Sequence, residues 1–351
     1  DTDRSRGLGD VYKRQVHLLF NVIGVAVLLS VFCIVRAVLA PALLDESATR
    51  AGIAVAHSVF NLLCTAMLLP AGDLLEKLAI RLVPDSKSAE TVSELDERLL
   101  AAPSLALSRS RAVACEMAQC AVRALNNALR SFTEYTDTLA RSIRDDEERC
   151  DHYEDILGTY LVQLSARKMG VDESEEATEL LKSIGDFERI GDHALNLQES
   201  AKELHEKQLT FSTIAREEVD VLTSLLEDLL NSALRSFQSD DPQMARQVEP
   251  LEETMDLLTE EIRSRHIRRL QSGQCTIQLG FILNDLLNNA ERVGDHCSNI
   301  AVSVIEEQEK QTASHAYLHS LKKNDEFSFQ LQQNLSRYVL PAETAEDQPA
   351  E

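Results

Sequence analysis

The sequence contains no tryptophan and few aromatic residues, which together make up 5% of its 351 residues. Glycine and proline are absent from residues 104–157. Leu, Ala, Glu and Arg dominate instead, and this composition favours helices over sheets. We therefore expect an all-α protein.

Cysteine is present but forms no recognisable framework. The sequence has no CxxC pair, and its seven cysteines are irregularly spaced, at positions 33, 64, 115, 120, 150, 275 and 297. This pattern indicates reduced, buried thiols of an intracellular protein rather than disulfides or a zinc site.

Basic residues are also scarce, since 35 Lys and Arg face 58 Asp and Glu and leave a net charge of −23. A nucleic-acid-binding protein must meet the phosphate backbone with an excess of Lys and Arg, so we expect no nucleic acid partner. An acidic surface is compatible with cation binding, although it more often only promotes solubility.

Charge of either sign is almost missing from residues 16–72, and this change of composition marks a domain boundary. The first fifteen residues, DTDRSRGLGDVYKRQ, match nothing that follows and resemble a translated sequencing-adaptor remnant. We exclude residues 1–15 as a non-native leader. On that interpretation the natural protein begins further upstream, and this chain is a fragment.

Two apolar stretches, 18–35 and 51–69, are each long enough to cross a bilayer core of roughly 30 Å. They predict two transmembrane helices within a membrane segment that spans 16–85; the alternative is a buried hairpin in a soluble protein. An amphipathic stretch follows at 74–82, typical of a helix at the lipid surface. Its Lys77 and Arg81 favour a cytoplasmic location for the rest of the chain, which begins with a polar linker at 86–103.

Both apolar stretches contain the motif H-x-x-F-N, which gives the pairs His17/Asn21 and His57/Asn61. A spacing of four residues places each pair on one helix face. Polar groups inside a membrane usually face the bundle interior. These four side chains therefore either line a transport path or join the helices by hydrogen bonds.

The acidic part of the chain repeats itself. NNALRSF at 126–132 returns as NSALRSF at 231–237, and ERIGDHALNL at 188–197 returns as ERVGDHCSNI at 291–300. Self-similarity of this kind indicates a duplicated structural unit. Apolar residues at three- and four-residue spacing predict three helices per unit, at 105–136, 138–167 and 174–206, then 213–239, 242–272 and 276–308.

We therefore expect residues 104–310 to form two antiparallel three-helix bundles. Residues 311–351 are a C-terminal tail that adds one more helix. We expect disorder in the last ten residues, which are rich in Pro, Ala and Glu.

Two helices of each unit carry the pattern Glu-x-x-x-Asp, which stacks both carboxylates on one helix face. Four carboxylates on two facing helices suit a hard or borderline cation such as Fe, Mn or Mg. The alternatives are a buried ion-pair network or a solvated face. The eight candidate metal ligands are Glu147, Asp151, Glu188, Asp192, Glu252, Asp256, Glu291 and Asp295.

A glycine precedes the Asp of each repeated motif, although glycine costs about 1 kcal/mol against alanine inside a helix. We expect Gly191 and Gly294 to let a neighbouring helix or an ion approach closely. The remaining polar residues of the motif, Arg189, His193, Arg292 and His296, are candidates for hydrogen-bond partners of the ligands rather than ligands themselves.

In combination, these motifs resemble a known family. The duplicated unit with ERIGDHALNL and ERVGDHCSNI resembles the PhoU family, and residues 263–301 resemble the PhoU-like tail of bacterial sodium-dependent phosphate cotransporters. Residues 53–70, IAVAHSVFNLLCTAMLLP, resemble the last membrane segments of that cotransporter family. The resemblance covers residues 16 to about 310.

The resemblance implies a multi-pass protein of the inner (plasma) membrane that moves phosphate with sodium, with a cytoplasmic PhoU-like domain that regulates uptake. It also implies that the eight carboxylates hold a metal cluster. The family's Gln-Ser-Ser substrate motifs do not occur in this chain. Phosphate and sodium would therefore bind to the missing upstream part.

Two alternatives come from other functional classes. A PhoU-like signalling adaptor would work by protein contact, without transport activity. A ferritin-like di-metal enzyme would use Glu together with Glu-x-x-His, whereas here His directly follows Asp. No nucleophile–base pair is evident, so we expect no enzyme; assembly into a homo-oligomer is left open.

Overall fold

The computed structural model describes residues 95–309 and 325–342, together with short helical stretches within 24–38 and 58–66. The chain divides into two units, Asp1–Val92 and Ser93–Glu351. Among the described residues, no helix is both long and apolar enough to cross a bilayer. Eight residues of 18–35 and twelve of 51–69 lie outside the described residues, so the two transmembrane helices remain a prediction.

In the second unit, every regular element of the described residues is helical, which confirms the all-α fold. The elements are η3 (Glu97–Ala101), α4 (Pro103–Arg130), α5 (Asp137–Ser165), α6 (Val171–Glu206), α7 (Thr213–Ser239), α8 (Pro242–Ala245), α9 (Val248–Gln271), α10 (Ile277–Glu309) and α12 (Asp325–Arg337).

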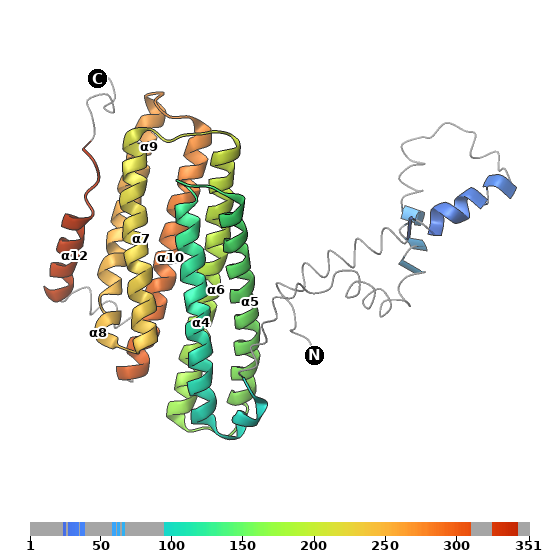
Figure 1. Ribbon diagram of the computed structural model, residues 1–351, viewed down its shortest axis with the longest axis horizontal. Coiled ribbons are helices and arrows are strands. Elements are labelled where there is room, and N and C mark those ends of the chain that lie inside the picture. Colours follow the sequence, from blue (N-terminus) through green and yellow to red (C-terminus); the bar gives the residue numbers. More distant parts are fainter. Residues whose placement is uncertain are drawn as a thin grey trace. The chain divides into compact units, whose positions relative to one another are not determined.

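The long helices form two groups of three (Figure 1). Helices α4, α5 and α6 pack on one another, and α7, α9 and α10 do the same. Helix α6 also packs along α10, and α4 contacts α7, so the two groups share one long interface. These groups correspond to the two predicted three-helix bundles.

Side-chain caps fix where several helices begin. Thr136 Oγ1 accepts a hydrogen bond from the backbone of Leu139 at the start of α5. Ser212 caps α7 in the same way, and Asp241 caps α8. Each cap satisfies a backbone N–H that the helix leaves unpaired.

The structure differs from the sequence prediction at 242–272, where one helix was expected. The chain forms the short helix α8, breaks at Arg246 and Gln247, and starts again as α9. Pro250 explains the break, because a proline ring inside a helix would clash with the carbonyl four residues earlier, that of Arg246. In α9, Pro250 occupies the first turn, where its missing N–H costs nothing.

Small residues bring the first three helices close together. The buried face of α4 carries many alanines, among them Ala106, Ala114, Ala118, Ala121, Ala124 and Ala128. Larger side chains from the neighbouring helices fill the core, including the fully buried Phe187 and Leu157. Close helix packing of this kind holds the backbone rigid and so fixes the polar side chains at its edge.

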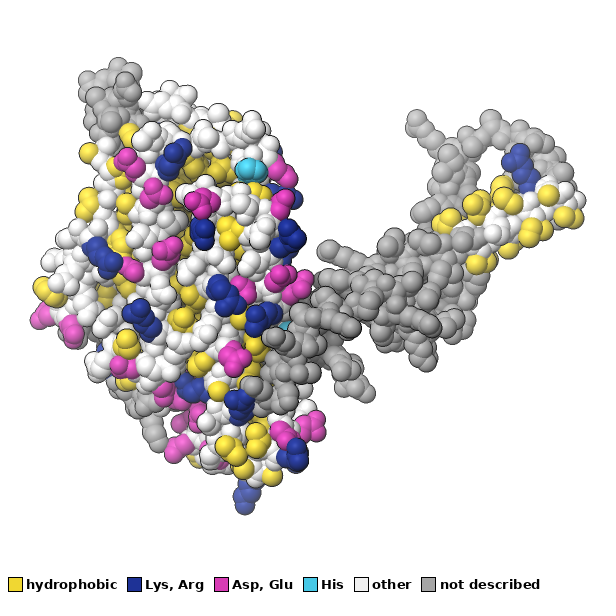
Figure 2. Space-filling view, in the orientation of Figure 1, with side chains coloured by type: hydrophobic (Ala, Val, Ile, Leu, Met, Phe, Trp, Pro, Cys, Tyr) yellow, Lys and Arg dark blue, Asp and Glu magenta, His cyan; other side chains and the backbone are white. Residues whose placement is uncertain are grey.

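The C-terminal tail contains the expected additional helix, α12, which packs on α9. Phe327 and Tyr338 are buried against the bundle, with 6% and 5% of their surface exposed. On the face shown in Figure 2, acidic and basic side chains are interspersed over the helices rather than gathered by sign.

Candidate metal centre

The two motif glycines lie against the helices that carry the other carboxylates. A Cβ atom added at Gly191 of α6 would lie 3.6 Å from Cβ of Cys150 and 3.9 Å from Cγ of Glu147, both on α5. One added at Gly294 of α10 would lie 3.7 Å from Cγ of Glu252 on α9. A Cβ atom at these distances makes ordinary van der Waals contact, so each glycine faces the neighbouring helix but an alanine would fit there too.

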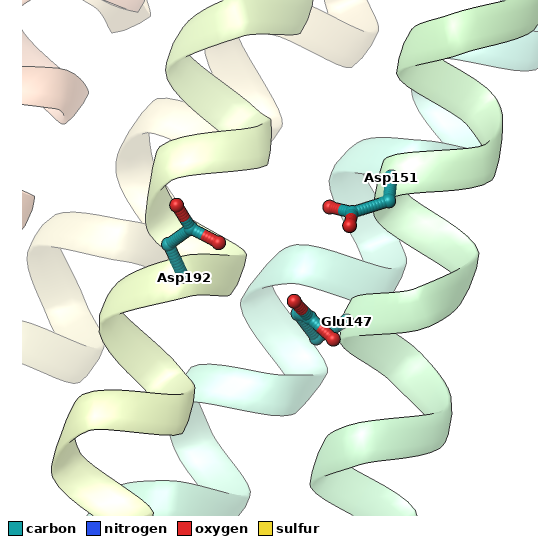
Figure 3. A group of neighbouring side chains, drawn as sticks. All are labelled: Glu147, Asp151 and Asp192. Carbon is teal, nitrogen blue, oxygen red and sulfur yellow. The ribbon is translucent and has the colours of Figure 1, made fainter. Parts of the chain in front are cut away.

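In the first repeat, three of the predicted ligands converge. Glu147 and Asp151 project from α5 towards Asp192 on α6, and each offers an oxygen within 4.8 Å of the others (Figure 3). Glu147 and Asp151 are half-buried, and Asp192 is exposed. Oδ1 of Asp151 is buried and has no hydrogen-bond partner among the described residues. Such a set of carboxylate oxygens fits a cation that prefers oxygen ligands.

The fourth predicted ligand of this repeat, Glu188, lies one helical turn before Asp192 on α6. Burial, as the largest cause, and the charges of Asp192 and Asp151 together raise the pKa of Glu188 to about 7. Glu188 is thus electrostatically part of the same cluster.

The pKa values of the α5 acids are raised for the same reasons. Burial is the largest cause for Glu147, whose pKa rises to about 7 with further contributions from Asp151 and Asp192. The pKa of Asp151 rises to about 6, through burial and then the charges of Asp192 and Asp155. Burial likewise raises the pKa of Asp192, although the charges of His193 and Arg189 oppose this. A bound cation would relieve this repulsion between carboxylates.

In the second repeat, an arginine lies among the predicted ligands. Arg263 of α9 donates to both carboxylate oxygens of Glu291, at 3.2 Å from Nη1 to Oε1 and 3.0 Å from Nη2 to Oε2. Thr259 Oγ1 donates to the same carboxylate at 2.9 Å. A cleft of about 870 Å³ lies here, lined by Asp256, Glu260, Arg263, Ser264, Ile267, Asn288, Glu291, Arg292 and Asp295.

The other predicted ligands of the second repeat lie at this cleft or beside it. Asp256 and Asp295 are exposed, and Glu252 is buried. Within the part of the chain that the structure describes, these acids do not form a group of three with oxygens as close as those of the first repeat.

The motif histidines lie between the two repeats. Nδ1 of His193 is 2.8 Å from Oδ1 of Asn289, and Nδ1 of His296 is 2.8 Å from Oδ1 of Asp186. The two imidazole rings are 5.6 Å apart. Each histidine thus bonds across the α6–α10 interface to the other repeat through Nδ1, and its Nδ1 partner is not one of the eight predicted ligands.

The motif arginines lie at the surface. Arg189 is exposed, and its positive charge opposes the rise in the pKa values of Glu188 and Asp192. Arg292 forms a long contact with Asp295, at 3.5 Å from Nη1 to Oδ2. The polar residues predicted for the membrane, His17, Asn21, His57 and Asn61, lie outside the described residues.

Three residues that contact the motif side chains were not predicted from the sequence: Arg263, Asp186 and Asn289. Asp186 and Asn289 are 103 residues apart, the same offset that relates the two repeated motifs. That offset, followed a few residues upstream of the motif, would have identified them as a related pair.

Comparison with known proteins identifies the duplicated region. The family model of the PhoU domain matches the chain twice, at residues 114–201 and 219–304. These residues belong to the PhoU domain family. The first match lies within α4–α6 and the second within α7–α10, so each three-helix group corresponds to one PhoU domain.

Curated relatives of these PhoU domains align over about half of the chain. The phosphate-specific transport system accessory protein PhoU homolog 1 of Thermotoga maritima is 26% identical over 182 residues, which cover 52% of this chain and 78% of that protein. The PhoU homolog of Pseudomonas aeruginosa is 25% identical over 182 residues, or 74% of its length.

One further relative aligns over a longer stretch. A candidate inorganic phosphate export protein of Salmonella typhimurium, YjbB, is 21% identical over 262 residues. The alignment covers 72% of this chain and 48% of YjbB, so the chain spans about half the length of that relative.

Two solved PhoU structures have the same fold. PhoU from Pseudomonas aeruginosa superposes with a TM-score of 0.54 and 23% identity, covering 58% of this chain and 98% of that one. The phosphate transport system regulatory protein PhoU from Streptococcus pneumoniae superposes with a TM-score of 0.54 and 18% identity, over 60% and 99% of the two chains.

Proposed function

We propose that this chain regulates phosphate transport by binding a transport protein, and that it catalyses no reaction. The observation that carries the proposal is the double PhoU match, because it accounts for both bundles. The relatives in Thermotoga and Pseudomonas are accessory proteins of phosphate-specific transport, which supports the same role for this chain.

Phosphate uptake in cells tests this function. In a strain that lacks the gene, we expect uptake of radioactive phosphate to lose its normal response to external phosphate, and the gene in trans to restore it. Sulfate uptake in the same cells is the control. An unchanged phosphate response in the deletion strain would remove the regulatory role.

We further propose that the first repeat binds a divalent or trivalent cation, Fe, Mn or Mg, through Glu147, Asp151, Glu188 and Asp192. The convergence of Glu147, Asp151 and Asp192 supports this, as does the unpartnered buried oxygen of Asp151. A cation would neutralise acids that burial and mutual repulsion now disfavour as anions. The remaining polar residues of the motif, Arg189 and Arg292, are proposed to tune the charge beside the acids.

Metal analysis of the purified full chain tests the cation proposal. We expect Glu188→Ala/Asp192→Ala to lose the metal that the wild-type chain retains. Circular dichroism is the control for folding. The proposal fails if the variant is folded and carries as much metal as the wild type.

We propose as a second candidate function that the chain is the C-terminal part of a sodium:phosphate symporter; the longer alignment with YjbB supports a link to phosphate transport, and the sodium coupling follows only from the family resemblance. The 262 residues aligned with YjbB exceed the 182 aligned with the Thermotoga PhoU homolog. In this proposal, residues 16–85 anchor the chain in the inner membrane and the PhoU domains lie in the cytoplasm. An upstream part would bind sodium and phosphate.

Membrane fractionation separates the two functions. If the symporter proposal holds, the full chain sediments with membranes and deletion of residues 16–72 releases it. A full chain that stays in the supernatant would leave the PhoU adaptor as the better account.

A further inference from the structure

The two repeats carry different residues around equivalent carboxylates. An offset of 105 relates Glu147 and Asp151 on α5 to Glu252 and Asp256 on α9. The packing supports this register, because Gly191 faces Glu147 as Gly294 faces Glu252. The same offset relates Gly158 to Arg263 and Glu154 to Thr259, and the offset of 103 relates Gly185 to Asn288.

In the second repeat, the residues at these three positions, Thr259, Arg263 and Asn288, form one set of hydrogen bonds around the carboxylate of Glu291. Arg263 and Thr259 both donate to Glu291, and Nη2 of Arg263 also donates to Oδ1 of Asn288 at 3.0 Å. The side chains of Arg263 and Glu291 keep 35% and 31% of their surface exposed, so the pair is partly buried. A guanidinium fork on two carboxylate oxygens is a strong, oriented contact.

In the first repeat, two of the equivalent positions are glycines, Gly158 and Gly185, and the third is an acid, Glu154. A Cβ atom at Gly185 would meet nothing within 4 Å, and one at Gly158 would meet only Oε1 of Glu154, at 3.7 Å. Burial raises the pKa of Glu154. The pKa of Glu188, the equivalent of Glu291, is raised by burial and neighbouring acids, and the charge of Arg189 opposes that rise.

We propose that Arg263 takes the place of a metal ion in the second repeat, so that this chain binds a cation at the first repeat alone. The inference rests on the proposed metal centre of the first repeat. The residues present around Glu291 do not fit a metal, because a cationic side chain already occupies its carboxylate oxygens. Among the described residues, no basic side chain pairs in this way with Glu188, and the first repeat retains its acids.

A metal-binding experiment tests this asymmetry with manganese as the probe. The purified full chain is dialysed to equilibrium with Mn²⁺, and bound manganese is counted per chain. Glu188→Gln/Asp192→Asn abolishes the binding, whereas the matched variant Glu291→Gln/Asp295→Asn keeps it. Equal loss of manganese in the two variants would overturn the inference.

A second experiment tests whether Arg263 prevents the second repeat from binding the ion. Thr259→Glu/Arg263→Gly gives the second repeat two residues of the first. Bound manganese rises above the wild-type level, and adding Glu291→Gln removes the gain. A folded graft variant that binds no more manganese than the wild type contradicts the proposal.

A third measurement needs no metal and separates this inference from the proposed metal centre. Arg263→Gln and Glu291→Gln, singly and together, form a double-mutant cycle in urea unfolding. For a partly exposed pair we expect a coupling of about two- to fivefold in the unfolding equilibrium constant. If no form binds manganese, the metal centre fails and the cycle alone decides; a coupling of zero overturns the role of Arg263.

Discussion

The acids of the first repeat give the metal-free protein a pH dependence of its own. Burial and neighbouring charges raise the pKa of Glu147 and of Glu188 from 4.5 to about 7. A carboxyl group with a raised pKa in the folded state holds its proton more tightly there than in the unfolded chain. Its contribution to stability is therefore complete below the unfolded value and is lost as the pH rises through about 7.

We therefore predict that the metal-free chain unfolds at a lower urea concentration at pH 8 than at pH 5.5. Glu147→Gln/Glu188→Gln removes two of the acids with raised pKa values and so weakens this dependence, which Asp151 retains in part. The exposed Glu134 and Glu217 serve as a matched control, because Glu134→Gln/Glu217→Gln leaves it as in the wild type. A wild-type midpoint that rises over this interval would contradict the assignment.

Gly191 gives a steric prediction. An added Cβ would meet Cys150 at 3.6 Å, an ordinary contact, and alanine is the better helix former. We predict that Gly191→Ala stabilises the fold by up to about 1 kcal/mol. Gly191→Leu, which must push α5 away, costs about 1–3 kcal/mol.

The control for this pair is Gly185→Leu, since a Cβ at Gly185 has open space around it. Thermal unfolding of the three variants provides the comparison. Equal effects of leucine at positions 185 and 191 would show that helix contact does not explain the glycine of the motif.

The sequence indicated the acids but not their partners. The Glu-x-x-x-Asp pattern marks all eight carboxylates equally, because residue spacing on a helix says nothing of what the neighbouring helix presents. Arg263 lies two turns beyond Asp256, outside the motif, and its equivalent in the first repeat is Gly158. The difference between the repeats therefore emerges only when the packed helices fix which residues face Glu291.

At the scale of helices, the α6–α10 interface depends on polar contacts between the repeats. Asp186 and His296 keep 7% and 9% of their surface exposed, so loss of either partner leaves a buried polar group without its bond. We predict that Asp186→Ala lowers the free energy of unfolding by about 1–3 kcal/mol. Asn289→Ala removes the equivalent contact to the less buried His193 and should cost less.

The C-terminal helix α12 is held by Asp228 of α7. The hydroxyl of Tyr338 donates to Oδ2 of Asp228 at 2.5 Å, and Arg337 contacts the same oxygen at 2.6 Å. Tyr338→Phe keeps the ring and removes the hydroxyl. We predict that it lowers the free energy of local opening of α12 by about 1.5–3 kcal/mol, as hydrogen exchange of its amides would measure.

Ser336→Ala is the matched control, because that hydroxyl bonds only to a carbonyl of its own helix, that of Gln332. The control should leave the exchange of α12 unchanged. Equal protection of α12 in Tyr338→Phe and in the wild type would contradict the docking role of Asp228.

The helices themselves were largely predictable, because their apolar spacing and their caps are local properties. The predicted second helix of the first unit, 138–167, is α5 at Asp137–Ser165. The error at 242–272 has a local cause as well, since Pro250 breaks the helix before it. The cross-repeat bonds of His193 and His296 were not predictable from helix periodicity, because they depend on how α6 packs on α10.

In the molecule as a whole, duplication of one helical unit determines where the acids lie. Two PhoU domains of similar fold face each other across α6 and α10, yet only the first has three free carboxylates in reach of one another among the described residues. In the proposed function, the cation therefore binds the first domain, and Arg263 supplies the positive charge in the second.

Urea unfolding of the purified full chain at pH 7.5, with and without Mn²⁺, tests directly for a cation centre in the first repeat. An ion that binds only the folded state stabilises it by about 2.7 kcal/mol at a hundredfold excess over its Kd. We predict a rise of this order for the wild type and none for Glu188→Gln/Asp192→Asn. A wild-type midpoint that does not move with manganese would contradict a cation centre in the first repeat.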